Sequence, residues 1–278
     1  MPYQFDPDQM YRMPTHFGPR TGPRRGPDGR KFECLDNPYS TIFSVSFLSS
    51  AAQLERFLPP GFSLDGEPVV TVSASYMTEI EWLAGRGYNT LGVSFPVRFD
   101  GDVDRVSGNF LTVLWENLTD PILTGREEIG FSKIYCELPT PTSLRGQHHV
   151  IASWLGFKFL DLYVEDLREQ SRAEIDALTS KQSGAGALHY KYMPRTGEWG
   201  TADAAYAVLT PAETPNRRVL ERHVGAGRLQ FHKARWEDMP TQYNIVNAFA
   251  DLEIHEYRGA SLIKTVGGKD LSDQRILR

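Results

Sequence analysis

The sequence has few cysteines, no excess of positive charge and no long apolar run. Its two cysteines, Cys34 and Cys136, permit at most one disulfide, so a reducing compartment is expected. The net charge of −5 offers no basic surface for nucleic acid. No apolar run reaches the roughly 18 residues of a membrane span, and the first thirty residues hold no apolar signal-peptide core. We therefore expect a cytoplasmic protein without a membrane or nucleic-acid partner.

The common cofactor and metal motifs are also missing. No phosphate-binding loop stands between a strand and a helix, and no Gly-x-Ser-x-Gly nucleophile motif is present. His148 and His149 are adjacent, so on a strand they point to opposite faces and cannot share one ion. His223 and His232 have no nearby set of carboxylates or cysteines. The sequence therefore indicates chemistry without a cofactor or a metal.

The composition is that of a globular, loop-rich β protein. Of 278 residues, 40% are hydrophobic and 23% charged, while 24 glycines and 18 prolines argue against a bundle of long helices. Six prolines fall in residues 1–36, which predicts an extended N-terminal arm. Residues 37–278 are expected to form a single domain.

Period-two alternation of apolar and polar residues predicts many short strands. We expect helices only at 50–58, where Ser50 and Gln53 have the spacing of a capping box, and at 165–180. The predicted class is α+β, predominantly antiparallel β, with a barrel or cone closed to remove its edges and a few short outer helices. The expected strands lie near 70–76, 91–99, 110–115, 132–138, 149–157, 158–164, 188–193, 204–209, 219–224, 228–231 and 249–257.

One segment carries a candidate for chemistry. A Gly125-Arg126-Glu127 turn leads into a strand in which Lys133 alternates against an apolar face. By pattern alone Lys133 is either a solvent-facing strand lysine or a lysine that points into a closed barrel. In the second case burial would lower its pKa, and a neutral amine can attack a ketone to form a Schiff base. The pattern leaves both interpretations open.

This stretch resembles the acetoacetate decarboxylase family. The family shows an Asn- and Pro-containing turn, a Gly-Arg-Glu segment and an aromatic-Pro-Lys-Lys strand, which correspond here to residues 117–121, 125–127 and 131–134. Shorter matches occur in the same order at 58–61, 67–68 and 227–231. The resemblance covers roughly residues 38–258.

The resemblance implies a mostly antiparallel β cone, a homo-oligomer and no cofactor. It also implies a lyase in which Lys133, as the catalytic residue, forms a Schiff base with a keto acid or ketone. The protonated imine withdraws electrons, so that a carboxylate β to it leaves as carbon dioxide. This family is itself a standard example of a lysine activated by desolvation or by a neighbouring cation.

Several family positions are changed in this chain. Ile134 replaces the second lysine, Ser132 the proline, and Thr90 a glutamate; an acidic position falls near Ser73 and an arginine position near Ser40. Because the lost groups handle protons and the charge of the substrate, acetoacetate itself is not the expected substrate. Decarboxylation, aldol or dehydration chemistry on another keto acid or ketone is expected instead.

The alignment offers further substrate-binding candidates besides Lys133. Tyr88, Thr90, Glu127 and Gln230 are candidates for hydrogen bonding or proton transfer, and Arg126 for a bidentate contact with a substrate carboxylate, or for a structural ion pair. Two alternatives stay open. One is a non-catalytic barrel that binds a small molecule, and the other is a tautomerase or hydratase that uses Lys133 as a base without an imine.

We predict a homo-oligomer, because short strands, a proline-rich arm and several aromatic residues suggest apolar surface that a second copy would cover. Light scattering at micromolar concentration should give a multiple of the 31.4 kDa chain mass. A measured mass equal to that of one chain would refute this prediction.

Overall fold

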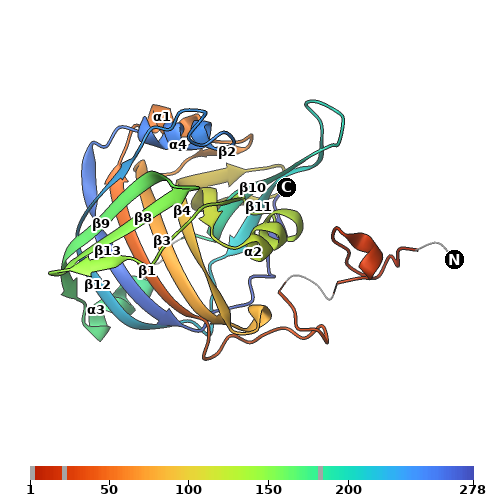
Figure 1. Ribbon diagram of the computed structural model, residues 1–278, viewed down its shortest axis with the longest axis horizontal. Coiled ribbons are helices and arrows are strands. Elements are labelled where there is room, and N and C mark those ends of the chain that lie inside the picture. Colours follow the sequence, from red (N-terminus) through yellow and green to blue (C-terminus); the bar gives the residue numbers. More distant parts are fainter. Residues whose placement is uncertain (1–3, 21–23, 181–183) are drawn as a thin grey trace.

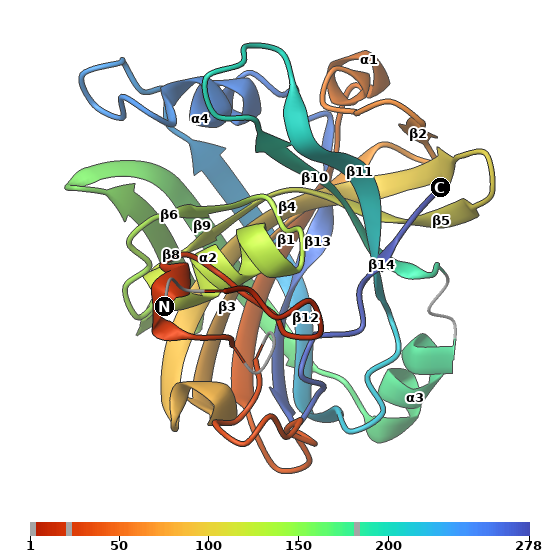
Figure 2. The same cartoon turned by 90° about the vertical axis from the view of Figure 1, so that its right-hand side faces the viewer.

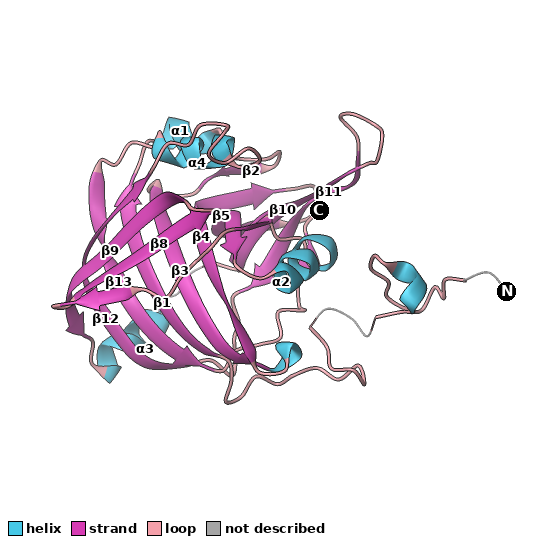
Figure 3. Ribbon diagram, viewed as in Figure 1, coloured by secondary structure: helices cyan, strands magenta, loops and turns pink. Residues whose placement is uncertain are grey.

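The computed structural model describes residues 4–20, 24–180 and 184–278, and within these fourteen strands belong to one hydrogen-bonded sheet (Figure 1). The helices are short and lie at its surfaces (Figure 3). The strands are β1 (Tyr39–Leu48), β2 (Phe62–Leu64), β3 (Val69–Ile80), β4 (Arg86–Asp100), β5 (Arg105–Glu116), β6 (Lys133–Tyr135), β7 (Thr142–Leu144), β8 (Gln147–Trp154), β9 (Phe157–Glu169), β10 (Gly186–Pro194), β11 (Ala202–Pro211), β12 (Arg218–Phe231), β13 (Glu256–Val266) and β14 (Arg275–Ile276).

The strand order is β14-β11-β10-β5-β4-β3-β1-β13-β12-β9-β8-β7, with β2 paired to β4 and β6 paired to β5. All of these pairs are antiparallel except β5 with β6 and β5 with β10. The predicted fold class, predominantly antiparallel β with a few short helices, is confirmed.

The sheet curls into a cone but does not close through a continuous ladder, contrary to the closed barrel that we expected. Among the described residues, β7 and β14 end the strand order, and a single isolated bridge between Glu137 and Ser153 joins the segment after β6 to β8. Both backbone bonds of this bridge form, at 2.7 and 3.0 Å. Among the described residues, the segment after β6 forms no other bridge to β8, so the two edges of the sheet are joined at one point.

The inner face of the cone forms the hydrophobic core. Strand alternation places Phe43, Val72, Leu91 and Trp115 on one continuous face, because they are connected through register partners or two-residue steps along β1, β3, β4 and β5. The Trp115 ring lies 5.2 Å from that of Phe159 on the opposite wall. The opposite face of the same strands does not contribute to this core.

The predicted helices are partly correct. The first is α1 (Ala51–Glu55), but Ser50 makes no side-chain cap, and Gln53 instead bonds the backbone of Asp251 and Glu253. In the second region β9 continues to Glu169, and helix α3 spans Arg172–Ser180.

Other elements differ from the expectation. The predicted strand at 249–257 is wrong: helix α4 (Tyr243–Ala250) occupies its first residues, because Val246 and Phe249 are three apart and both face the core. The strand predicted at 132–138 shortens to β6. Helix α2 (Thr119–Leu123) and the π-helical turn η3 (Thr124–Glu128) precede β6, while the 3-10 turns η1 (Thr15–Phe17) and η2 (Glu81–Leu83) lie elsewhere.

Cys34 and Cys136 are both buried free thiols, so the disulfide that the sequence permitted does not form. No helix among the described residues is long and apolar enough to cross a membrane. Residues of the N-terminal arm contact η3, where the Arg12 guanidinium lies 3.3 Å from the Glu128 carboxylate. Figure 2 views the molecule from the side on which the arm lies. The division into an arm at 1–36 and a domain at 37–278 stays a prediction.

The contact between Trp115 and Gln242 yields a stability prediction. Trp115 Nε1 donates to Gln242 Oε1 at 2.8 Å, and Gln242 Nε2 donates to the Tyr135 carbonyl at 2.9 Å. Gln242→Leu leaves both partners unsatisfied and should cost about 2–4 kcal/mol of unfolding free energy. Chemical denaturation measures this. The control Gln230→Leu, at an exposed strand position, should change stability by less than about 0.5 kcal/mol; equal effects would contradict the prediction.

Candidate active site

Lys133 is the first residue of β6 and lies on the face of the sheet opposite to the core. β6 runs parallel to β5, with Lys133 opposite Leu114 and Ile134 opposite Trp115. Ile134 packs against the core, so alternation directs Lys133 to the other face. Lys133 therefore does not point into the barrel interior, which was one of the two interpretations that the pattern left open. Lys133 is nevertheless buried, with 1% of its surface exposed.

A cover of short elements outside the cone keeps water from Lys133. Its Nζ donates to the carbonyl of Pro121 in α2 at 3.1 Å, and the Phe131 ring centre lies 5.3 Å away. Gly125 of η3 packs directly over the side chain: a Cβ at this position would stand 2.9 Å from Nζ and closer still to Cε. The glycine of the Gly-Arg-Glu turn thus leaves room for the lysine.

The closest charged partner of Lys133 is Glu116, the last residue of β5. Nζ lies 2.8 Å from Oε1, and the two side chains are 2% and 0% exposed. Glu116 is opposite Thr90 of β4 in register, so the changed family position lies beside this carboxylate. The sequence reasoning missed Glu116. Its signal was the end of the apolar run at Trp115, since the next residue must face away from the core.

Desolvation controls the protonation of this pair. Burial lowers the pKa of Lys133 to about 8; the Glu116 charge acts against this shift and the Arg24 charge acts with it. Burial also raises the pKa of Glu116, against the opposing effect of Lys133. Both shifts favour the uncharged forms, so a neutral amine beside a protonated carboxyl competes with the ion pair near neutral pH.

Arg24, from the N-terminal arm, is the second charged group that the sequence reasoning missed. It is 5% exposed and its guanidinium lies 5.5 Å from the centre of the Trp82 ring. It also neighbours Tyr88, whose pKa burial raises to about 12 while the Arg24 charge and hydrogen bond act to lower it. Arg24 Nε is buried with no hydrogen-bond partner among the described residues. This donor is therefore available to an anion.

The structure brings some of the predicted residues to Lys133. Tyr88 is buried with its ring centre 6.0 Å from Nζ, and Thr90 lies two residues along the same face of β4. Arg126 donates from its guanidinium to the Lys133 backbone carbonyl at 2.9 Å, which positions the strand.

Two predicted residues lie differently. The Glu127 carboxylate is 4.0 Å from Arg12 of the arm, and its backbone carbonyl accepts a hydrogen bond from Lys191. Gln230 is exposed on β12, opposite Asp161 of β9. Among the described residues, the groups near the Lys133 amine are Pro121, Glu116, Tyr88 and Phe131, and Gln230 is not one of them. A substrate-binding role for either stays a prediction.

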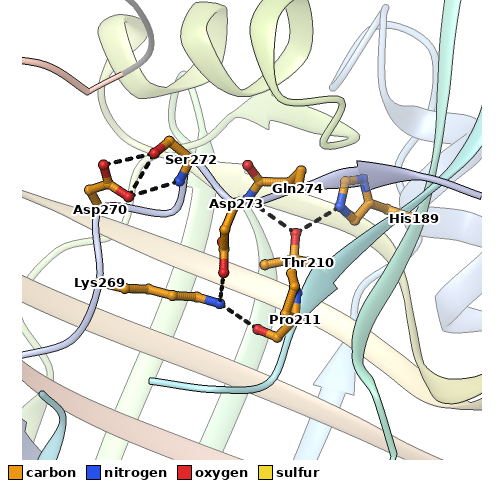
Figure 4. Close-up of polar contacts among 8 residues, drawn as sticks. All are labelled: His189, Thr210, Pro211, Lys269, Asp270, Ser272, Asp273 and Gln274. Carbon is orange, nitrogen blue, oxygen red and sulfur yellow. Dashed lines mark hydrogen bonds and ion pairs between the residues drawn. The ribbon is translucent and has the colours of Figure 1, made fainter. Parts of the chain in front are cut away.

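A buried histidine supports the segment before Lys133. The His189 ring stacks on Phe131 at 4.2 Å, and its Nδ1 lies 2.8 Å from the Gly130 carbonyl. Because a carbonyl only accepts, Nδ1 carries the proton, and Nε2 then accepts from the Thr210 hydroxyl at 3.0 Å. Gln274 in turn donates to Thr210 (Figure 4). Burial lowers the pKa of His189 to about 4, so this support is neutral.

The space next to the site is small. A cavity of about 70 Å³ is lined by Arg24, Trp82 and Tyr88 together with residues of the C-terminal segment, Lys269 and Asp270. Lys269 is fixed by the Pro211 carbonyl and by Asp273 (Figure 4). Lys133 lines none of the described cavities, and no group of metal-ligating side chains occurs among the described residues.

A buried lysine–glutamate pair on a β cone is an arrangement suited to amine catalysis. The sequence comparison identifies the family to which the chain belongs. The family model of acetoacetate decarboxylase matches residues 12–268. The chain therefore belongs to the acetoacetate decarboxylase family, as its sequence resemblance indicated. No curated protein sequence gave a significant match.

Solved structures share the fold. An acetoacetate decarboxylase from Legionella pneumophila subsp. pneumophila str. Philadelphia 1 has a TM-score of 0.64 at 20% identity, covering 87% of this chain and 88% of that one. The enduracididine biosynthesis enzyme MppR, complexed with the condensation product of pyruvate and imidazole 4-carboxaldehyde, has a TM-score of 0.60 at 16% identity, covering 90% and 93%. An acetoacetate decarboxylase-like enzyme from Sphingomonas wittichii RW1 has a TM-score of 0.58 at 19% identity, covering 87% and 94%.

The pair geometry predicts the effect of Glu116→Gln. The Glu116 charge favours the ammonium form of Lys133, so its removal should lower the pKa of Lys133 below about 8. The pH at which the Lys133 amine becomes half reactive toward a small acylating reagent should move down by about one unit. Peptide mass mapping after pulse labelling across pH measures this. Glu127→Gln serves as the control and should leave the midpoint in place; an upward shift in Glu116→Gln would contradict the assignment.

Proposed function

We propose that this protein is a cofactor-independent lyase in which Lys133 forms a Schiff base with a small keto acid or ketone. The observation that carries the proposal is the dry Lys133–Glu116 pair, in which burial lowers the amine pKa to about 8. At pH 7 about one amine in ten is then neutral, against fewer than about one in a thousand for an ordinary lysine. Membership of the acetoacetate decarboxylase family supports the same chemistry.

Glu116 is positioned for the proton transfers of imine formation. The neutral amine adds to the substrate carbonyl, forming the C–N bond of a carbinolamine. The protonated Glu116 carboxyl then gives its proton to the departing hydroxyl, which leaves as water. The products are a protonated imine on Lys133 and the Glu116 carboxylate, held as an ion pair by the same 2.8 Å geometry that now holds the ammonium form.

Arg24 is the best candidate to hold the substrate carboxylate. It is buried, charged, close to Tyr88, and has one unpaired donor. A guanidinium stabilises a carboxylate that stays in place more than one that departs as neutral carbon dioxide. This favours an α-keto acid that keeps its carboxylate, with the imine losing a neighbouring proton to become an enamine that attacks an aldehyde. Aldol addition followed by dehydration is therefore the first reaction to test, and decarboxylation the second.

The site contains an acidic and a basic group that the alignment did not reveal, so acetoacetate stays a substrate to test. The expectation against acetoacetate depended on lost acidic and arginine positions, but Glu116 and Arg24 supply one charge of each kind from other parts of the chain. The MppR structure, which contains a condensation product of pyruvate, makes pyruvate the more informative first substrate.

The test of the proposal is reductive trapping of the full-length protein with pyruvate and cyanoborohydride, followed by peptide mass mapping. The adduct should appear on Lys133, rise with pH around a midpoint near 8, and vanish in Lys133→Ala. The control is Lys191→Ala. Lys191 lies on β10 and donates to the Glu127 carbonyl, and its removal should leave trapping on Lys133 unchanged. Adducts spread evenly over surface lysines, or none at all, would contradict the Schiff base.

Trapping, read together with binding and turnover, separates the two alternatives. A binding barrel without catalysis would bind pyruvate or a related ketone but give neither an adduct nor turnover. A tautomerase or hydratase that uses Lys133 as a base would turn over without an adduct, and Lys133→Ala would still abolish its activity.

Arg24→Ala should affect substrate binding through charge. Loss of the guanidinium should raise the KM for an α-keto acid about tenfold or more, since charge-assisted bonds to a buried carboxylate are strong. It should also raise the pKa of Lys133, because the Arg24 charge lowers it. Steady-state kinetics with pyruvate and its trapping midpoint measure both effects. The neighbouring Arg25→Ala, whose guanidinium bonds the Gly29 carbonyl, is the matched control; an unchanged KM in Arg24→Ala would rule out this role.

A further inference from the structure

The largest described cavity lies at the mouth of the cone, on the face opposite to Lys133. It measures about 1190 Å³ and is lined by residues of β1, β3, β8, β12 and β13, among others. Tyr76 and Asn89, which line it, are register partners, and Asn89 lies two residues from Leu91, the partner of Trp115. The cavity therefore continues the core face and is separated from Lys133 by the sheet itself.

The floor of this cavity is aromatic and apolar. Phe43 is buried at its centre, with the Tyr76 ring edge-on at 6.1 Å and the His148 ring tilted at 5.4 Å. Leu262 is the register partner of Phe43 and is 6% exposed. His148 is held at Nδ1 by Ser143, and burial lowers its pKa, so it adds a neutral ring. Such a floor accommodates the flat apolar body of a small molecule.

A row of donors runs across three neighbouring strands just above this floor. Thr41 of β1 is the register partner both of Tyr76 on β3 and of Lys264 on β13. Adjacent strands lie about 4.8 Å apart, so the row spans about 10 Å and presents a phenol, an alcohol and an ammonium group. These are hydrogen-bond donors of the kind that a carboxylate requires.

The Tyr76 hydroxyl is the observation that points to a ligand. Its oxygen is buried and has no hydrogen-bond partner among the described residues. Burial raises the pKa of Tyr76 well above its usual value, so the hydroxyl keeps its proton and remains a donor. A buried donor without an acceptor is costly, and a ligand oxygen would remove that cost.

Two of the three carboxylates that line the cavity are held by protein partners, which allows its cations to meet an acid. Lys264 pairs with Glu221 at 2.9 Å, and His223 lies 3.6 Å from the same carboxylate, so Glu221 keeps a partner when Lys264 turns to a ligand. Glu165 is likewise engaged by Arg228 and Gln147. Glu221 and Glu165 thus have protein partners, whereas the Tyr76 hydroxyl has none among the described residues. Asp166 also lines the cavity, and Arg145 adds a second cation, besides Lys264, to the lining.

We propose that the mouth of the cone is a second binding site, separate from Lys133, for a small aromatic carboxylic acid. The ring lies on Phe43, His148 and Leu262, and the carboxylate accepts from Tyr76, Thr41 and Lys264. This site does not depend on the Schiff-base chemistry.

The experiment is calorimetric titration of the full-length protein with 2-naphthoate, with 2-naphthamide as the uncharged probe. The acid should bind one to one and about tenfold more tightly than the amide. Tyr76→Phe should weaken binding of the acid about three- to tenfold, because it removes one neutral donor. Lys264→Met should abolish the preference for the acid over the amide. Tyr76→Phe removes a hydroxyl that has no partner among the described residues, so the thermal stability of this variant should not fall.

Matched controls keep this site distinct from the others. Tyr190→Phe and Lys191→Met alter the same residue types in the second cavity, of about 530 Å³, and should bind 2-naphthoate like the wild type. Lys133→Ala should also bind it normally, whether or not the Schiff-base proposal holds. Absence of binding at millimolar acid, loss of binding in Lys133→Ala, or equal weakening by the control variants would overturn the proposal.

Discussion

Removal of the Lys133 amine and the Glu116 carboxyl from water is the constraint on which the rest of this site depends. Each group alone would be costly to bury, and the 2.8 Å contact lets them share one proton. The surrounding features all serve to keep this pair dry: the π-helical turn that places Gly125 over the lysine, the Pro121 carbonyl, and the Phe131 ring held by neutral His189. A charged residue in place of His189 would add an unpaired ion to the same apolar region.

The sheet uses its two faces for different purposes. On β5, Trp115 points into the packed core and Glu116, the next residue, points to the lysine. On β4, Leu91 and Asn89 face inward while Tyr88 and Thr90 face the site. Because every site residue on these strands is flanked by inward-facing neighbours, the site is held by the same packing that stabilises the fold.

The sequence was sufficient for those features that depend on local pattern. The alternation at 91–99, the expected strands at 149–157 and 158–164, and the Gly125-Arg126-Glu127 segment predicted strands and a turn that the structure contains. It was insufficient for Glu116 and Arg24, because their role comes from long-range contacts: a parallel pairing of β5 with β6, and an arm that packs back onto the site. It also left the side of the sheet open, since alternation fixes that Lys133 and Ile134 face opposite ways but not which of the two faces the core.

The central claim is that desolvation beside Glu116 lowers the pKa of Lys133 to about 8, so that a usable fraction of the amine is neutral near physiological pH. The most direct measurement is heteronuclear NMR of protein labelled with 15N at the lysine side chains, titrated from pH 6 to 11, with Lys133→Arg used to assign the signal. The account predicts a Lys133 midpoint near 8, well below those of the exposed lysines. A midpoint at or above about 10, as for an ordinary lysine, would contradict it.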